Sequence, residues 1–129
     1  MMTPLAPSLL APPFGAYSHG ISAGGVVVTS GQLALAADGS IPEGVTAQAE
    51  MCFDNVAAIL AEAGADFSHV LRFTAFVTRR EDMAAYMAVR DRHVRGLAVK
   101  PASTLLIVTG FTRPEFLVEV EAMALLPQR

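Results

Sequence analysis

The stretch from Thr46 to Gly64 places the strongest constraint on the fold of this chain. Its apolar residues recur at spacings of three and four, which puts them on one face of a helix: Ala49, Cys52, Phe53, Val56, Ile59, Leu60 and Ala63. Gly64 supplies the C-terminal stop. A second helix is predicted from about Glu81 to Arg95, with Gly96 as its stop and three residues facing inward: Met83, Met87 and Val94.

Short runs of alternating or β-branched residues surround the two helices. In the run 69–78 one set of alternating positions forms a strand face made of Leu71, Phe73, Ala75 and Val77. Runs at 16–22 and 26–35, separated by the segment 23–25 with its two glycines, indicate a hairpin. After Pro101 two more strands are expected, at about 103–109, which looks like a buried strand, and at about 116–125.

This order of elements predicts an α+β fold, in which a mixed sheet carries both helices on one face. A strand, a crossover helix and another strand imply parallel pairing. The other face of the sheet then needs a cover, and a neighbouring subunit is the obvious one.

The composition predicts one domain, residues 1–129, that associates with copies of itself. A chain of 129 residues with 53% hydrophobic residues has ample material for one core. Only 16% of the residues are charged, which indicates that apolar surface is hidden against other chains. Residues 1–16 form an arm that is predicted to be irregular, because it contains Pro4, Pro7, Pro12 and Pro13.

Charge and hydropathy argue against several classes of partner. A formal net charge of -3, with Lys100 as the single lysine, supplies no basic stripe for a phosphate backbone, so nucleic acid is not an expected partner. No apolar run approaches the roughly 20 residues of a membrane span, and the first residues lack the features of an export signal. The lone Cys52 cannot form an internal disulfide. We therefore expect a cytoplasmic protein with no membrane partner.

Familiar catalytic signatures are absent from the sequence, which has no G-x-S-x-G, H-E-x-x-H or Walker loop. His19, His69 and His93 are too dispersed to indicate a metal site, and one cysteine removes the soft-ligand options. We expect no metal and no cofactor. The roles of His19, which lies close to Tyr17, and of Arg113 stay open at this stage.

Two carboxylates and one turn are the candidate chemical groups. Glu119 and Glu121 stand two apart on a predicted strand and so share one face, opposite Val118, Val120 and Ala122. One interpretation is that this strand face is exposed to solvent. The other is that a second subunit covers it, so that partial loss of water raises the pKa of a glutamate and lets it exchange protons near neutrality. The turn Ser30–Gln32 offers backbone N–H groups to an anion or is merely the end of a strand.

Several segments together resemble the RidA (YjgF-type) family, whose best-known members are enamine/imine deaminases. They are GAYSHGI, VVVTSGQLAL, NVAAILAEAGADFSHVLRFTAFVT, KPAST and RPEFLVEVEAMAL, and they cover about Gly15 to Leu125 in the right order. The resemblance implies a chorismate-mutase-like α+β fold and a homotrimer with three clefts between subunits. It also implies that a small-molecule metabolite is the partner.

The resemblance assigns roles to individual residues. Tyr17 matches the cleft tyrosine of the family, Glu119 matches the glutamate thought to position the attacking water, and the S-G-Q turn is matched by Ser30, Gly31 and Gln32.

Three positions depart from the family pattern and put α-imino acid deamination in doubt. Ser103 replaces the arginine of the P-A-R-[ST] motif that grips the substrate carboxylate, Leu105 replaces a small residue, and Met87 replaces an asparagine often found in the second helix. These changes make the cleft more apolar and remove its fixed cation.

We therefore expect a trimer that binds a small carbonyl, imine or enamine metabolite in its inter-subunit clefts. Glu119 would act as general base or water-positioning group in a hydrolysis, deamination, dehydration or tautomerisation. The turn Ser30–Gln32 and the Ser103 hydroxyl would donate hydrogen bonds, and Tyr17 would cover the ligand. The alternative is a non-catalytic metabolite-binding or regulatory trimer. Ribonuclease activity is the weakest option, because an acidic chain attracts phosphate poorly.

Overall fold

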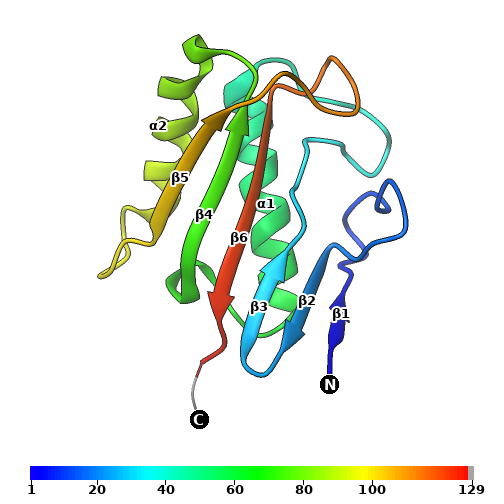
Figure 1. Cartoon of the computed structure of the whole chain (residues 1–129), viewed down its shortest axis with the longest axis vertical. Helices are drawn as coiled ribbons and strands as arrows, with labels where there is room; N and C mark the ends of the chain where they lie inside the picture. The colour runs from blue at the N-terminus through cyan, green and yellow to red at the C-terminus, as the bar shows by residue number, and fades with distance from the viewer. Residues whose placement is uncertain (128–129) are drawn as a thin grey trace.

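A six-stranded mixed sheet organises the chain in the order β1-β2-β3-β6-β4-β5 (Figure 1). The structure, a computed structural model, describes residues 1–127. The strands are β1 (Thr3–Leu5), β2 (Gly20–Ala23), β3 (Val26–Thr29), β4 (Val70–Val77), β5 (Ala102–Ile107) and β6 (Val118–Leu125). The helices are α1 (Val45–Glu62) and α2 (Met83–Val94). A short 3-10 turn, η1 (Phe67–His69), follows α1, and a second one, η2 (Arg80–Asp82), directly precedes α2. Both helices lie behind the sheet in Figure 1, as predicted.

The predicted hairpin is present as β2 and β3, which pair antiparallel. Gly24 and Gly25 close it with φ angles of 57° and 85°, a region that residues with a Cβ rarely adopt. The arm 1–16, predicted to be irregular, contains one regular element. Strand β1 pairs antiparallel with β2 there, because its single buried residue, Leu5, reaches the core. Pro4 is tolerated on this edge strand because it need not donate to a ladder.

Helix α1 follows the predicted pattern closely. It begins one residue before Thr46 and ends two residues before Gly64, which has a φ of 78°. The apolar residues predicted on its inner face are buried except Ala63, which packs at the edge of the core. In the core Phe53 of α1 meets Phe73 of β4, with ring centroids 5.1 Å apart. This apolar face holds α1 against the middle of the sheet.

Helix α2 differs from its prediction in which residues face inward. The buried residues are Tyr86, Val89 and Val94, whereas Met87 is 37% exposed. The chain enters through η2, where the Arg79 side chain pairs with buried Asp82 at 2.9 Å. The predicted inward position of Met87 was therefore wrong, because the helix is rotated so that Tyr86 fills the space beside Phe53.

The neighbours of β4 explain two further departures. Strands β4 and β5 are parallel and joined through α2, as the crossover rule predicts, but β6 separates β3 from β4. A shift in register between Val70 and Arg72 puts Val70 in the core and leaves Leu71 50% exposed. Strand β5, which looked buried in the sequence, is an edge strand with most of its residues exposed.

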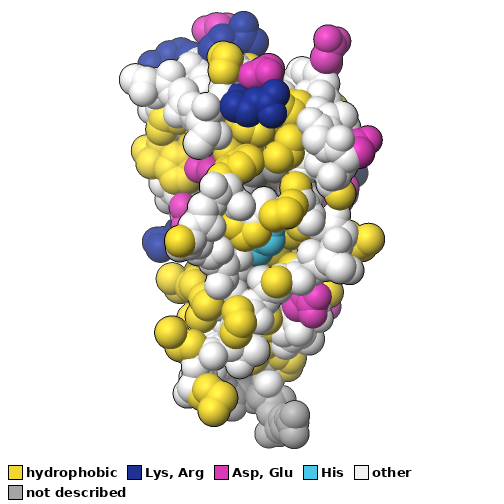
Figure 2. Space-filling view, turned by 90° about the vertical axis from the view of Figure 1, so that its right-hand side faces the viewer, with side chains coloured by type: hydrophobic (Ala, Val, Ile, Leu, Met, Phe, Trp, Pro, Cys, Tyr) yellow, Lys and Arg dark blue, Asp and Glu magenta, His cyan; other side chains and the backbone are white. Residues whose placement is uncertain are grey.

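The face of the sheet that carries no helix exposes several apolar side chains. Its exposed side chains include Val26 and Val28 of β3, Leu106 of β5, and Met123 and Leu125 of β6, each between 37% and 48% exposed. We call this surface the open face. Hydrophobic side chains also reach the surface along the side that bears β1 and β2 (Figure 2). Within residues 1–127 no helix is long and apolar enough to cross a membrane.

Candidate functional site

Glu119 lies on β6 near the centre of the sheet. The predicted alternation along this strand is confirmed, since Val118, Val120 and Ala122 are buried towards the helices. Glu119 and Glu121 therefore project from the open face, and both are half-buried. Strand β4 flanks Glu119 on one side, where Phe76 pairs with it, and the turn Ser30–Gln32 after β3 lies on the other side.

The carboxyl group of Glu119 rests on the backbone of Gly31. Gln32 and Val120 exchange two backbone hydrogen bonds, with N to O distances of 2.8 and 3.1 Å. These two bonds hold the turn beside β6. A Cβ placed on Gly31 would lie 2.6 Å from the Glu119 Cδ and 2.8 Å from its Oε2. Only glycine leaves room for the carboxyl group in this position. The S-G-Q turn and Glu119 thus form one local structure, within one chain.

Burial raises the pKa of Glu119 above its ordinary value of 4.5, and the neighbouring charge of Glu121 raises it further. Both causes disfavour the ionised form, because removal of water and a like charge each penalise a carboxylate. A raised pKa brings the group closer to the range in which it can both accept and release a proton near neutrality.

The turn Ser30–Gln32 offers fewer free donors than the sequence predicted. The Ser30 N–H donates to the His19 carbonyl at 2.8 Å, and its hydroxyl donates to the Ser18 carbonyl at 2.6 Å. The Gln32 N–H donates to Val120. The Gly31 N–H is the one main-chain donor of the turn for which the part of the chain described here shows no acceptor. Both Ser30 donors are used within the chain in this conformation, and the use of Ser30 as a donor to a ligand stays a prediction.

Tyr17 and His19 pack the N-terminal arm against this turn. The Tyr17 hydroxyl accepts from the Phe14 N–H at 3.1 Å, and the Tyr17 side chain is 46% exposed. His19 places Nε2 2.7 Å from the Ala11 carbonyl and Nδ1 3.4 Å from the Gln32 amide nitrogen. With Gly31 these residues line a small cavity of about 20 Å³, roughly the space of one water. His19 thus links the arm to the turn.

Ser103, Leu105 and Met87 lie away from Glu119 within one chain. Ser103 pairs with Phe73, whose side chain faces the helices, so Ser103 is on the helix side of the sheet while Glu119 is on the open face. Strand β4 also stands between them. Leu105 packs against the core, and Met87 is exposed on α2.

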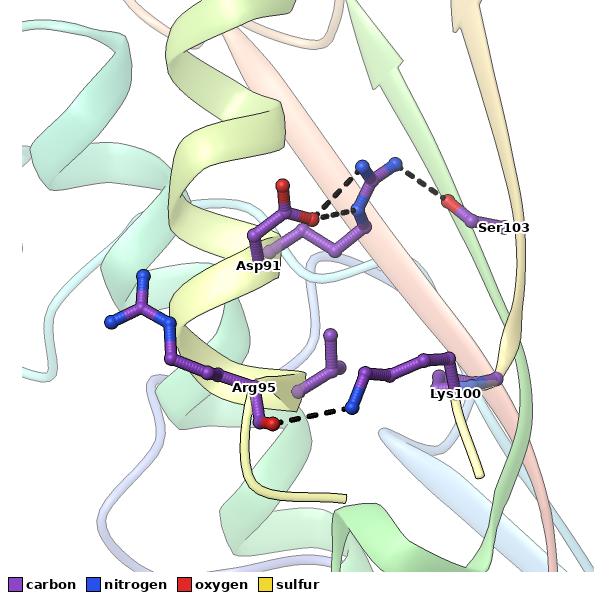
Figure 3. Close-up of a pocket in the computed structure, with 7 residues that line it drawn as sticks. Asp91, Arg95, Lys100 and Ser103 are labelled. Carbon is purple, nitrogen blue, oxygen red and sulfur yellow. Dashed lines mark hydrogen bonds and ion pairs between the residues drawn. The ribbon is translucent and has the colours of Figure 1, made fainter. Parts of the chain in front are cut away.

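Arg90 on α2 is a site candidate that the sequence reasoning missed. Its Nη1 donates to the Ser103 hydroxyl at 3.2 Å, and its Nε donates to Asp91 at 3.0 Å (Figure 3). Arg90 follows Met87 by three residues and precedes Val94 by four, two positions that the sequence placed on the inner face. The position of a positively charged residue at helical spacing from these two residues was the feature of the sequence that could have indicated Arg90.

The remaining polar groups serve local structure. Arg113, whose role was open, pairs with Glu115 at 2.9 Å and lies over the Phe116 ring at 5.9 Å. His69 accepts from the Asp66 N–H at 3.0 Å, and His93 lies 2.8 Å from Glu50. Over residues 1–127 no group of three or more His, Cys, Asp and Glu side chains is arranged to hold a metal ion.

Comparisons with known proteins place the chain in a family. A family model described as Endoribonuclease L-PSP matches residues 8–126. The chain is 31% identical over 112 residues to the 2-iminobutanoate/2-iminopropanoate deaminase of Escherichia coli (strain K12), covering 85% of this chain and 87% of that protein. It is 37% identical over 114 residues to Protein DfrA of Myxococcus xanthus, covering 85% of each.

Solved structures agree with this placement. The structure of E. coli TdcF with bound serine has a TM-score of 0.90 at 27% identity, over 97% of this chain and 99% of that one. The YjgF gene product of E. coli has a TM-score of 0.88 at 29% identity, over 95% and 98%. The fold is therefore the α+β fold of the YjgF-type proteins. The chain belongs to the Endoribonuclease L-PSP family, which is the RidA family of the sequence resemblance.

Proposed function

We propose that this protein hydrolyses a small imine or enamine metabolite, with Glu119 as the group that positions and deprotonates the attacking water. The observation that carries the proposal is the half-buried carboxyl group of Glu119, held against Gly31 and with its pKa raised. Membership of a family with relatives named as imine deaminases supports the same chemistry.

The reaction needs one proton acceptor that later becomes a proton donor. The substrate enters as the protonated imine. Glu119 takes a proton from water while the oxygen bonds to the imine carbon and the carbon–nitrogen π electrons move to nitrogen, which gives a carbinolamine. Glu119 then gives its proton to the carbinolamine nitrogen. The carbon–nitrogen bond breaks with its electron pair leaving on ammonia, and the hydroxyl releases its proton to water, which leaves the carbonyl product. A carboxyl group with a raised pKa suits both halves of this cycle.

The proposed site lies between subunits of a homotrimer. Ser103 and Glu119 face opposite sides of one sheet, so a ligand that touches both must lie between two chains. The apolar open face supplies a surface for such an assembly. The Gly31 N–H is a hydrogen-bond donor near Glu119, and Tyr17 lines the same small cavity as Gly31.

Small α-imino acids are expected to be poor substrates. Ser103 has a short neutral side chain where the family pattern carries an arginine, and a guanidinium binds a carboxylate through two charge-assisted hydrogen bonds. Such bonds contribute roughly 1.5 to 3 kcal/mol each, so turnover of 2-iminopropionate should be at least about tenfold below that of an arginine-bearing relative. The Ser103→Arg variant should recover only part of it, because the new cation would lie beside Arg90.

The test measures hydrolysis of freshly generated imines by the wild type, Glu119→Gln and Glu121→Gln. The second substitution is a matched control, since Glu121 lies two residues away on the same strand and face. Loss of turnover in Glu119→Gln alone supports the proposal. Binding without turnover in the wild type, for every imine and enamine tried, would instead support a metabolite-binding trimer.

A further inference from the structure

A pocket of about 480 Å³ lies between α2 and the start of β5. It is lined by Arg90, Asp91, Val94, Arg95, Lys100, Pro101 and Ser103. Figure 3 shows Asp91 on the helix side of this pocket and Lys100 and Ser103 on the strand side. Pockets of roughly 300 to 1,000 Å³ are typical of small-molecule sites, so the space suits a ligand larger than a carboxylate group alone.

The three cations of this pocket differ in their contacts. The guanidinium of Arg95 points away from the pocket (Figure 3). Lys100 donates to the carbonyl groups of Leu97 and Arg95 at 2.6 and 3.2 Å, which caps the end of α2. Arg90 reaches across the pocket to β5, with its side chain 22% exposed.

The Arg90 guanidinium is held in a fixed orientation. Asp91 engages its Nε and Nη2 from one side, each at 3.0 Å. The Ser103 hydroxyl accepts from Nη1, so its own hydrogen is available to a further acceptor. Part of the guanidinium donor set also stays free, because an arginine carries more N–H groups than these contacts use. The result is a pre-oriented cation and a hydroxyl donor side by side in the lining of the pocket.

We propose that Arg90 and Ser103 together bind the carboxylate of the substrate, whose carbon chain lies in the pocket along Val94 and Pro101. The inference rests on the proposed function, and it names the substrate class as a carbonyl, imine or enamine compound with its carboxylate several carbons from the reactive carbon. A three-carbon acid would leave most of the pocket empty. The buried Val94 and the ring of Pro101 offer an apolar wall to a longer chain.

The geometry also explains why a serine is useful at position 103. A longer side chain there would occupy the space in which the Arg90 guanidinium now meets β5. The cation thus comes from the helix instead of the strand. Arg90 and Ser103 act as substrate-binding residues in this arrangement, and Asp91 is a positioning residue for Arg90.

The experiment is a calorimetric titration of the full-length protein with three probes. They are 4-oxopentanoate, which has a carboxylate remote from its carbonyl carbon, 2-pentanone, which has none, and pyruvate, which has an adjacent one. The wild type should bind 4-oxopentanoate at least about tenfold more tightly than either other probe, as expected for a charge-assisted contact. A wild type that shows no such preference would overturn the inference.

Variants then locate the preference. Arg90→Gln should abolish it and Arg90→Lys should keep only part of it, because an ammonium lacks the planar fork. Arg95→Gln is the matched control, since it removes the same charge from the C-terminal end of the same helix, where the Arg95 guanidinium points away from the pocket. A preference that survives in Arg90→Gln, or that is lost equally in Arg95→Gln, would show that Arg90 does not bind the carboxylate. Unchanged assembly size and melting temperature exclude misfolding.

Two readouts separate this inference from the proposed function. Glu119→Gln should bind 4-oxopentanoate as the wild type does while it hydrolyses no imine. Arg90-dependent binding without turnover in the wild type would reject the hydrolase and keep the carboxylate site. Turnover that depends on Glu119 but not on Arg90 would support the hydrolase and reject the carboxylate site.

Discussion

At the residue scale, the contact between Gly31 and Glu119 connects two features that are far apart in the sequence. Position 31 requires glycine because a Cβ there would overlap the Glu119 carboxyl group. An unusual backbone angle is not the reason. The atoms that would be displaced belong to the flexible end of Glu119. A substitution there should therefore affect the chemistry more than the fold.

Gly31→Ala is expected to lower turnover nearly as much as Glu119→Gln, with a small change in melting temperature. The added methyl group would lie 2.6 Å from the Glu119 Cδ, so the carboxyl group must move. Gly96→Ala is the control, since nothing lies within 4 Å of its added methyl group. Steady-state kinetics and thermal unfolding of both variants provide the measurement. Full activity in Gly31→Ala would show that the observed position of Glu119 is not the catalytic one.

The raised pKa of Glu119 predicts a dependence of stability on pH. Folding favours the protonated carboxyl group, so this contribution is complete below its ordinary pKa of 4.5 and is lost as the pH rises through the folded-state pKa. Glu119→Gln is neutral at every pH. It should match the wild type at about pH 4 and become the more stable protein at about pH 8.

Melting temperatures across that range test this prediction. Glu43→Gln, a change at an exposed position, corrects for the general loss of one negative charge. A stability difference for Glu119→Gln that does not grow with pH would contradict the assigned direction of the pKa.

At the scale of elements, the packing of β2 on α1 depends on Gly20. A Cβ there would lie 2.5 Å from the Ile59 Cγ2 and 3.2 Å from the Val28 carbonyl oxygen. Since a backbone atom and a fully buried side chain surround the site, little can move. Gly20→Ala should destabilise the protein by about 1 to 3 kcal/mol, the usual cost of overpacking a core. Chemical denaturation measures this, with Gly96→Ala again as the control. An unchanged midpoint would mean that β2 can shift away from α1.

Strand β5 and helix α2 show how far an element can be predicted. The sequence indicated both elements and placed their ends within a few residues. It did not reveal that β5 is an edge strand, because an apolar run such as 105–108 is equally expected in a buried one. Nor did it reveal that α2 turns Arg90 towards Ser103, since only Met83, Met87 and Val94 were expected to face inward.

At the scale of the whole molecule, the open face is the surface that we propose is covered in the trimer. Val28 lies on it and is 39% exposed. Val28→Asp should shift the protein from a trimer to smaller species, because a buried unpaired carboxylate is costly. Val99→Asp, at a position 82% exposed, should leave the assembly unchanged. Light scattering distinguishes the species, and a wild type that is monomeric at micromolar concentration would reject the trimer.

The sequence by itself determined the two helices, the hairpin and the face of β6 that carries Glu119. These features follow from local spacing, since periods of two and of about 3.6 residues reflect backbone geometry alone. The family resemblance assigned Tyr17, Glu119 and the S-G-Q turn to one cleft between subunits, and the structure shows Gly31 against Glu119 within one chain. For such features a short window of residues, or a matching pattern, carries the information.

Only the tertiary structure decided the order of the strands, the exposure of Leu71, the internal hydrogen bonds of Ser30 and the contact of Arg90 with Ser103. Each depends on which distant segments lie side by side. Strand β6 pairs with β3 on one edge and β4 on the other while its apolar face packs against α1, and no local period records that order. The same non-local packing brings α2 over the start of β5, and it therefore decides where the cation of the candidate pocket lies.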